Sequence, residues 1–130
     1  MKVLLIDDDR NHLESISDAL VLNGIETSLF LNPLEALESF FSCNYDAVIT
    51  DIRMSEMDGI KVLEKILKFD PETHVIVMTG YPFPGDSVST LSKGACAFFH
   101  KPLDIDNVLQ LLAKINKKLS KGKENGPDTK

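Results

Sequence analysis

The chain has 130 residues, of which 43% are hydrophobic and 26% are charged, and its formal net charge is −6. This length and composition fit one globular domain with its own core. The negative charge argues against direct nucleic-acid binding, which needs a basic surface. No apolar run approaches the ~20 residues of a membrane-spanning helix, and the N-terminal residues lack a signal-peptide pattern. We therefore expect a cytoplasmic protein without membrane contact, whose Cys43 and Cys96 are reduced.

Five apolar runs have the length and composition of buried strands, and a helical pattern follows each of them. The strands are expected at residues 2–6, 25–30, 45–51, 74–78 and 95–99. The helices are expected at residues 9–22, 33–41, 60–69, 86–93 and 104–119. This alternation predicts an α/β fold of the (βα)5 type, a five-stranded parallel sheet with helices on both faces. Residues 1–119 would form this domain, and the polar residues 120–130 a disordered tail or linker stub.

The expected elements differ in how apolar they are. The strand at 25–30 is half polar, which favours an edge of the sheet. The helix that begins at residue 33 is expected to bury both Phe40 and Phe41. The helix at 86–93 contains three serines and only Val88 and Leu91 as apolar anchors. Because a helix held by few apolar contacts opens easily, we expect it to be the least stable element.

Polar side chains stand where the predicted strands end. Asp7 and Asp8 follow the first strand, Asp51 ends the third, Thr79 follows the fourth, and Lys101 follows the fifth. Ligands of open α/β sheets gather at this edge, because the carboxyl ends of parallel strands meet there. Three carboxylates close together repel one another, so the pattern predicts a divalent-cation site. Mg²⁺, which prefers oxygen ligands, is the natural occupant.

The order of the elements and these strand-end residues resemble the receiver domain of two-component response regulators, a family with a flavodoxin-like fold. The resemblance covers residues 2–119 and is closest to receivers of enhancer-binding transcriptional activators. It is carried by Leu5-Ile6-Asp7-Asp8-Asp9, Thr50-Asp51-Ile52-Arg53-Met54, Met57-Asp58-Gly59, Met78-Thr79-Gly80 and His100-Lys101-Pro102. One departure is Ser55, at a position where the family usually has proline.

The resemblance implies that Asp51 accepts a phosphoryl group from a phosphohistidine, with the help of Mg²⁺. Asp8, Asp51 and the main-chain carbonyl of Arg53 would bind the cation directly. Asp7 would bind it through water. A carboxylate can act as the nucleophile because phosphoryl transfer depends mainly on positioning and charge neutralisation.

The resemblance also implies roles for residues around the acceptor. Lys101 would contact a phosphoryl oxygen as a point charge, and Thr79 would offer it a hydroxyl hydrogen bond. Phe98 matches the aromatic switch position of the family, with a plain core phenylalanine as the alternative. The Lys101-Pro102 peptide bond is cis in the family, and the sequence leaves its isomer open. Phosphorylation would switch the surface formed by the fourth helix, the fifth strand and the last helix.

The implied partners are a sensor histidine kinase or a phosphotransfer protein upstream, and an output domain or a separate protein downstream. A homodimer is a further alternative. The domain would not be an enzyme beyond catalysing its own phosphorylation and dephosphorylation.

Two other functions stay open. An aspartate-nucleophile phosphatase shares the fold style and the Mg²⁺, but such enzymes typically carry a second acid where this chain has Arg53. A phosphorylation-independent interaction module would not need the complete set of strand-end residues. The three histidines share no spacing that indicates a metal or catalytic role, so they are expected to be structural or solvated: His12, His74 and His100.

Overall fold

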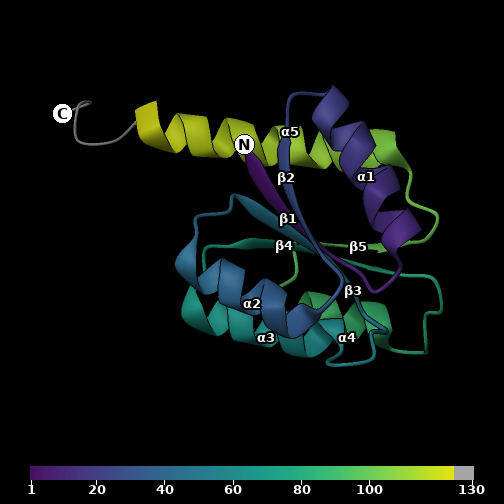
Figure 1. Cartoon of the computed structure of the whole chain (residues 1–130). Coiled ribbons are helices and arrows are strands. Elements are labelled where there is room, and N and C mark those ends of the chain that lie inside the picture. The colour runs from purple at the N-terminus through teal and green to yellow at the C-terminus, as the bar shows by residue number, and fades with distance from the viewer. Residues whose placement is uncertain (125–130) are drawn as a thin grey trace.

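The computed structural model describes residues 1–124, with side chains described as far as residue 119. Five strands and five helices alternate along this part of the chain (Figure 1). The strands are β1 (Lys2–Ile6), β2 (Glu26–Phe30), β3 (Ala47–Asp51), β4 (His74–Thr79) and β5 (Ala97–His100). The helices are α1 (Arg10–Leu22), α2 (Pro33–Ser42), α3 (Gly59–Phe69), α4 (Asp86–Ser92) and α5 (Ile105–Glu124). The expected (βα)5 alternation is confirmed.

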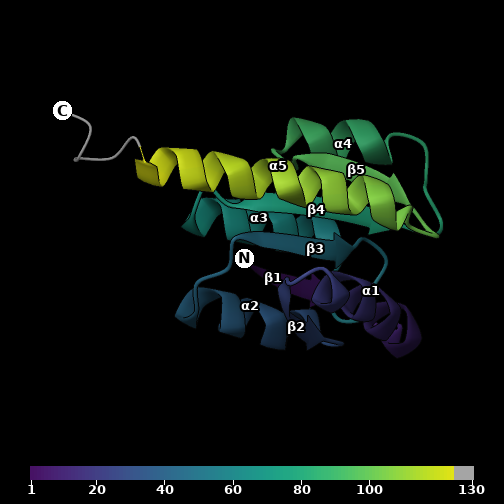
Figure 2. The same ribbon diagram turned by 90° about the horizontal axis from the view of Figure 1, so that it is seen from above.

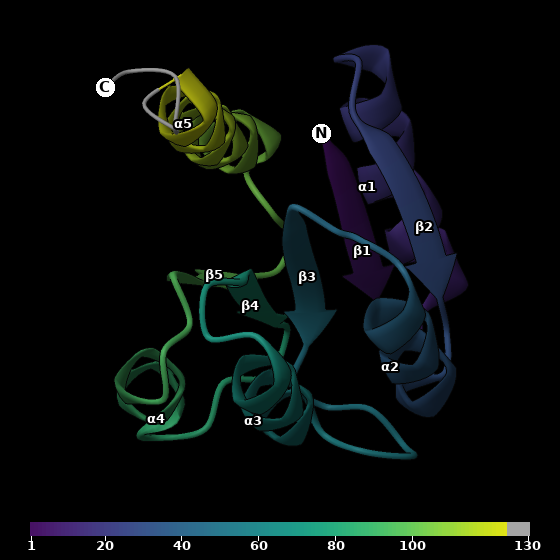
Figure 3. The same cartoon turned by 90° about the vertical axis from the view of Figure 1, so that its left-hand side faces the viewer.

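All strand pairs are parallel, and the strand order is β2-β1-β3-β4-β5 (Figure 2). Helices α1 and α5 cover one face of the sheet, and α2, α3 and α4 cover the other (Figure 3). Side chains alternate between the faces along each strand. In β1, Val3 and Leu5 therefore join the core beneath α1 and α5, whereas Leu4 and Ile6 join the core beneath α2 and α3. Strand β2 is an edge strand with no fully buried residue, as its half-polar sequence predicts.

Two expected buried faces are wrong in part. In α2, Phe40 is 5% exposed but Phe41 is 44% exposed. In α4, the expected anchors Val88 and Leu91 are 71% and 48% exposed. The buried residues of this seven-residue helix are polar: Asp86 and Thr90. The side chain of Asp86 is bound by Arg53, so a polar contact rather than an apolar stripe sets the orientation of α4.

Helix α5 reaches Glu124, beyond the boundary expected at residue 119. Residues 125–130 lie outside the described residues, so the division into a domain and a tail or linker stub stays a prediction. Both cysteines are free and exposed. Among the described residues, no helix combines the length and the apolar character that crossing a membrane requires.

Gly59 joins α3 to the end of β3. Its amide donates a hydrogen bond to the carbonyl of Ile52 at 2.8 Å. A Cβ atom at Gly59 would overlap the main-chain carbonyl of Asp51. The preceding residue, Asp58, caps the helix by accepting a hydrogen bond from the Lys61 amide at 2.9 Å. The start of α3 thus lies directly against the backbone of Asp51, and only glycine fits there.

We expect Gly59→Ala to lower the free energy of unfolding by ~2 kcal/mol or more, because the added methyl group meets backbone that cannot move aside cheaply. Urea denaturation measures this change. Gly80→Ala is the matched control, since its Cβ would meet only the Lys101 side chain, at 3.5 Å. Equal stability of the two variants would contradict the packing argument.

Candidate functional site

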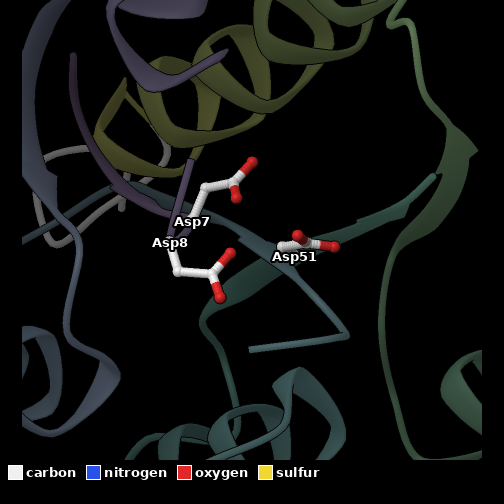
Figure 4. A group of neighbouring side chains, drawn as sticks. All are labelled: Asp7, Asp8 and Asp51. Atoms are coloured by element: carbon white, nitrogen blue, oxygen red, sulfur yellow. The ribbon is translucent and has the colours of Figure 1, made fainter. Parts of the chain in front are cut away.

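Three carboxylates meet at the carboxyl ends of β1 and β3. Asp7 and Asp8 follow β1 directly, and Asp51 is the last residue of β3. One oxygen of each lies within 4.8 Å of the others, and Figure 4 shows the three side chains grouped at this edge. Asp7 is fully buried, Asp51 is 5% exposed, and Asp8 is exposed. The structure therefore brings together the acids that the strand-end pattern singled out.

Lys101 links the two buried acids. Its Nζ lies 2.8 Å from Asp7 Oδ2 and donates a hydrogen bond to Asp51 Oδ2 at 2.9 Å. The other Asp51 oxygen, Oδ1, accepts a hydrogen bond from the Ile52 amide at 2.8 Å. The Lys101-Pro102 peptide bond, just after β5, is cis, which answers the question that the sequence leaves open.

Thr79 and Phe98 belong to β4 and β5, the two strands beyond β3 in the sheet. Thr79 is fully buried at the end of β4, and its Oγ1 accepts a hydrogen bond from the Tyr81 amide at 3.2 Å. Phe98 in β5 is half-buried, packs against the core beneath α2 and α3, and lies edge-on to His100 at 5.6 Å between ring centroids. Phe98 is therefore neither a fully buried core residue nor a fully exposed one.

Burial and neighbouring charges shift the pKa values of the buried acids and the lysine in different directions. Burial raises the pKa of Asp7, but hydrogen bonds from His12 and Lys101 outweigh this and lower it to about 2. Burial also raises the pKa of Asp51, and the nearby Asp7 charge adds to this, while Lys101 opposes it. For Lys101, burial lowers the pKa, but its two carboxylate partners leave it raised overall. One ammonium thus faces three carboxylates, and the excess negative charge favours a bound cation.

His12 is the site residue that the sequence does not reveal. Its Nδ1 lies 2.7 Å from Asp7 Oδ2, the same oxygen that Lys101 contacts. Asp9 caps α1 by accepting a hydrogen bond from the His12 amide at 3.2 Å, which places His12 in the first turn of the helix. In the sequence, Asp9 before the first helix is the signal for this position. An N-cap at Asp9 places His12 in the first turn, with its side chain near the end of β1.

Arg53 is divided between two locations. The residue lines an open pocket together with Asp8, Gly80 and Tyr81. Its guanidinium turns away to Asp86, with Nη2 2.6 Å from Asp86 Oδ2. The side chain of Arg53 is therefore committed to Asp86, and the expected role of its carbonyl as a cation ligand stays a prediction. Carboxylate and carbonyl oxygens together are the donor set that Mg²⁺ prefers.

We expect Asp51→Asn to raise the metal-free stability at pH 7 by roughly 1 kcal/mol, a usual scale for buried polar groups. The raised pKa of Asp51 means that its ionised form opposes folding above that pKa. This penalty disappears below its ordinary value of 3.8, where both states are protonated. Urea denaturation with a chelator at several pH values measures the difference. A stability difference between Asp51→Asn and wild type that stays constant down to pH 3 would contradict this expectation.

We expect His12→Leu to raise the pKa of Asp7 from about 2 toward its ordinary value of 3.8, because one of its hydrogen bonds is lost. Lys101 remains in contact, so the rise should be partial. Carbon-detected NMR titration of the Asp7 carboxyl measures it. His74→Leu, at the far end of β4, serves as the control, and identical Asp7 titrations in all three proteins would contradict the assignment.

Comparison with known proteins places the chain in one family. The family model of the response regulator receiver domain matches residues 3–113. The chain is 38% identical over 112 residues to the transcriptional regulatory protein ZraR of Klebsiella oxytoca, covering 86% of this chain and 25% of that protein. It is 38% identical over 107 residues to the regulatory protein AtoC of Escherichia coli, covering 82% and 23%. The chain thus spans about a quarter of the length of these relatives.

Solved structures agree with this match. A receiver domain protein from Methanospirillum hungatei superposes with a TM-score of 0.82 at 31% identity, covering 96% of this chain and 98% of that one. The regulator TrrA from Thermotoga maritima, solved in complex with Mg²⁺ and a beryllium fluoride, gives 0.79 at 31% identity, covering 88% and 97%. The chain therefore belongs to the response regulator receiver domain family of two-component signalling.

Proposed function

We propose that Asp51 is the phosphoacceptor of this receiver domain. The observation that carries the proposal is the contact between Lys101 and a nearly buried Asp51 carboxylate at 2.9 Å, beside an open pocket. In the transfer step, an oxygen of Asp51 attacks phosphorus, and the phosphorus–nitrogen bond of a phosphohistidine breaks as the new phosphorus–oxygen bond forms. Positioning and charge compensation supply most of the catalysis in such transfers.

The residues at this site fit Mg²⁺. Asp8, Asp51 and the Arg53 carbonyl would hold the cation directly, and Asp7 would hold it through water. In support, Asp7 Oδ2 already lies 2.7 Å from His12 and 2.8 Å from Lys101, so it has little capacity left for direct coordination. When bound, the cation would neutralise the carboxylates and the incoming phosphoryl oxygens.

Lys101 and Thr79 would respond to the phosphoryl group. Lys101 already carries its positive charge at the acceptor, and a short movement would transfer that charge to a phosphoryl oxygen. Thr79 would exchange the hydrogen bond that it accepts from Tyr81 for one that it donates to the phosphoryl group. The space that Thr79 leaves behind would admit the half-buried Phe98 ring, which makes Phe98 the switch residue.

The output of the switch would be the surface formed by α4, β5 and α5. In support, Val88 and Leu91 leave α4 with exposed apolar side chains. A sensor histidine kinase or a phosphotransfer protein would supply the phosphoryl group, and an output domain, a downstream protein or a second copy would bind this surface. Because relatives such as ZraR are transcriptional regulators, we propose a part in transcriptional control, without nucleic-acid contact by this domain. A cytoplasmic location and the absence of any other enzymatic activity stay predictions.

Intact-mass spectrometry after incubation with acetyl phosphate and Mg²⁺ tests the proposal. Wild type should gain a single phosphoryl adduct, which a chelator prevents, whereas Asp51→Asn should gain none. Asp9→Asn is the matched control, because it lines the same pocket and asparagine also caps helices. An adduct on Asp51→Asn would disprove the acceptor. Failure of wild type with both acetyl phosphate and phosphohistidine donors would favour a phosphorylation-independent module, and steady turnover of a phosphate ester would favour a phosphatase.

A further inference from the structure

The side chain of Arg53 connects the segment after β3 to the first residue of α4. Its Nη2 lies 2.6 Å from Oδ2 of Asp86, a residue 33 positions further along the chain. The Asp86 side chain is only 10% exposed, and that of Arg53 is 30% exposed. A charge pair this shielded from solvent resists screening and is costly to break on one side only.

Phe83 completes this contact. Its amide donates a hydrogen bond to the same Oδ2 atom of Asp86 at 2.7 Å. Its ring centroid lies 4.0 Å from the guanidinium carbon of Arg53, within the range of a cation–π interaction. The loop between β4 and α4 is thus fastened to Arg53 through both its main chain and an aromatic side chain.

Other contacts at the N-terminus of α4 are few. Gly85 stands at the N-cap and provides no side-chain hydrogen bond, and Val88 and Leu91 face outward. The C-terminal end of α4 has a separate link, in which Lys93 lies 2.7 Å from Glu64, but both side chains are about two-fifths exposed. Exposed pairs of this kind contribute little. The buried Arg53–Asp86 pair is therefore the main polar attachment at the start of α4.

The pair is also imperfectly satisfied. Arg53 Nε is buried and has no hydrogen-bond partner among the described residues. A buried donor without a partner costs free energy, so the arrangement is less stable than a fully satisfied pair. The Arg53–Asp86 contact holds α4 in place but leaves Arg53 Nε unpaired in the described part of the chain. A modest movement of the Arg53 backbone can therefore release it.

We propose that Arg53, Asp86 and Phe83 form a latch that couples occupancy of the cation and phosphoryl site to the position of α4. The inference rests on the proposed function for one point, the Arg53 carbonyl as a cation ligand. The main chain of Arg53 would then belong to the site while its side chain holds α4. Binding at the carbonyl shifts the residue from which the latch extends. Arg53 and Asp86 are positioning residues in this scheme, and neither side chain takes part in the transfer.

Thermodynamic reciprocity makes the latch measurable without phosphorylation. If cation binding alters the latch, then breaking the latch must alter cation affinity by the same factor. Couplings between sites commonly lie between about 5-fold and 150-fold in affinity. Breaking the latch should therefore have two linked effects. It should change amide exchange in α4 of the metal-free protein, and it should change the Mg²⁺ affinity.

Hydrogen–deuterium exchange and calorimetric Mg²⁺ titration test the proposal on Arg53→Met, which keeps the main-chain carbonyl and an apolar stem against Phe83. We expect exchange across 86–92 in the metal-free protein to rise about five-fold or more. Separately, we expect Mg²⁺ affinity to differ from that of wild type by about five-fold or more. Mg²⁺ should alter exchange in this segment for wild type but not for the variant. Glu64→Gln, which breaks the exposed link of Lys93, is the matched control and should leave both quantities within about two-fold.

Asp86→Asn provides a second, isosteric variant should Arg53→Met fail to fold, and it should reproduce both effects. Unchanged exchange across 86–92 in either folded variant would overturn the latch. Increased exchange with unchanged Mg²⁺ affinity would overturn the coupling. Either result can accompany normal phosphorylation of Asp51, so failure of the latch is separable from failure of the proposed function. Absence of Mg²⁺ binding to wild type would overturn both.

Discussion

The structure depends on how a parallel sheet holds charge at its carboxyl edge. Asp7 and Asp51 are nearly inaccessible to water, and ionised carboxylates in such places need partners. Lys101 supplies one charge for both acids, and His12 supplies a further hydrogen-bonding contact to Asp7. This compensation is incomplete, because Asp8 adds a third carboxylate to the same group. The same excess of negative charge that is costly to the fold favours a bound cation.

Backbone packing holds Asp51 in place as firmly as its charge contacts do. Asp51 lies at the end of β3, a strand whose residues are all buried and which pairs with β1 on one side and β4 on the other. Asp51 itself pairs with Met78 of β4. The absent side chain of Gly59 lets α3 begin against the Asp51 carbonyl, and the Ile52 amide holds one carboxylate oxygen. Asp51 therefore lies on rigid elements, whereas the side chain of Arg53, two residues later, reaches Asp86 at the start of the more weakly held α4.

The strand-end pattern predicted the fold and the gathering of the acids, because hydrophobic periodicity and parallel topology together determine which residues share an edge. Hydrophobic periodicity predicted the wrong buried face where polar contacts set the orientation of a helix. In α4, Val88 and Leu91 point outward because Arg53 binds Asp86, a partner 33 residues away that no local pattern indicates. No spacing in the sequence indicates His12, because its contact with Asp7 forms between the first turn of α1 and the end of β1. The exposure of Phe41 depends on how α2 meets α3, where Phe69 lies 4.9 Å away between ring centroids.

The sheet divides the interior into two hydrophobic clusters with no residue in common. Helices α1 and α5 rest on one of them, while α2 and α3 rest on the other, on the side where α4 also lies (Figure 3). Side chains beneath α4 can therefore repack with little effect on the cluster under α1, because the hydrogen-bonded backbone of the whole sheet stands between them.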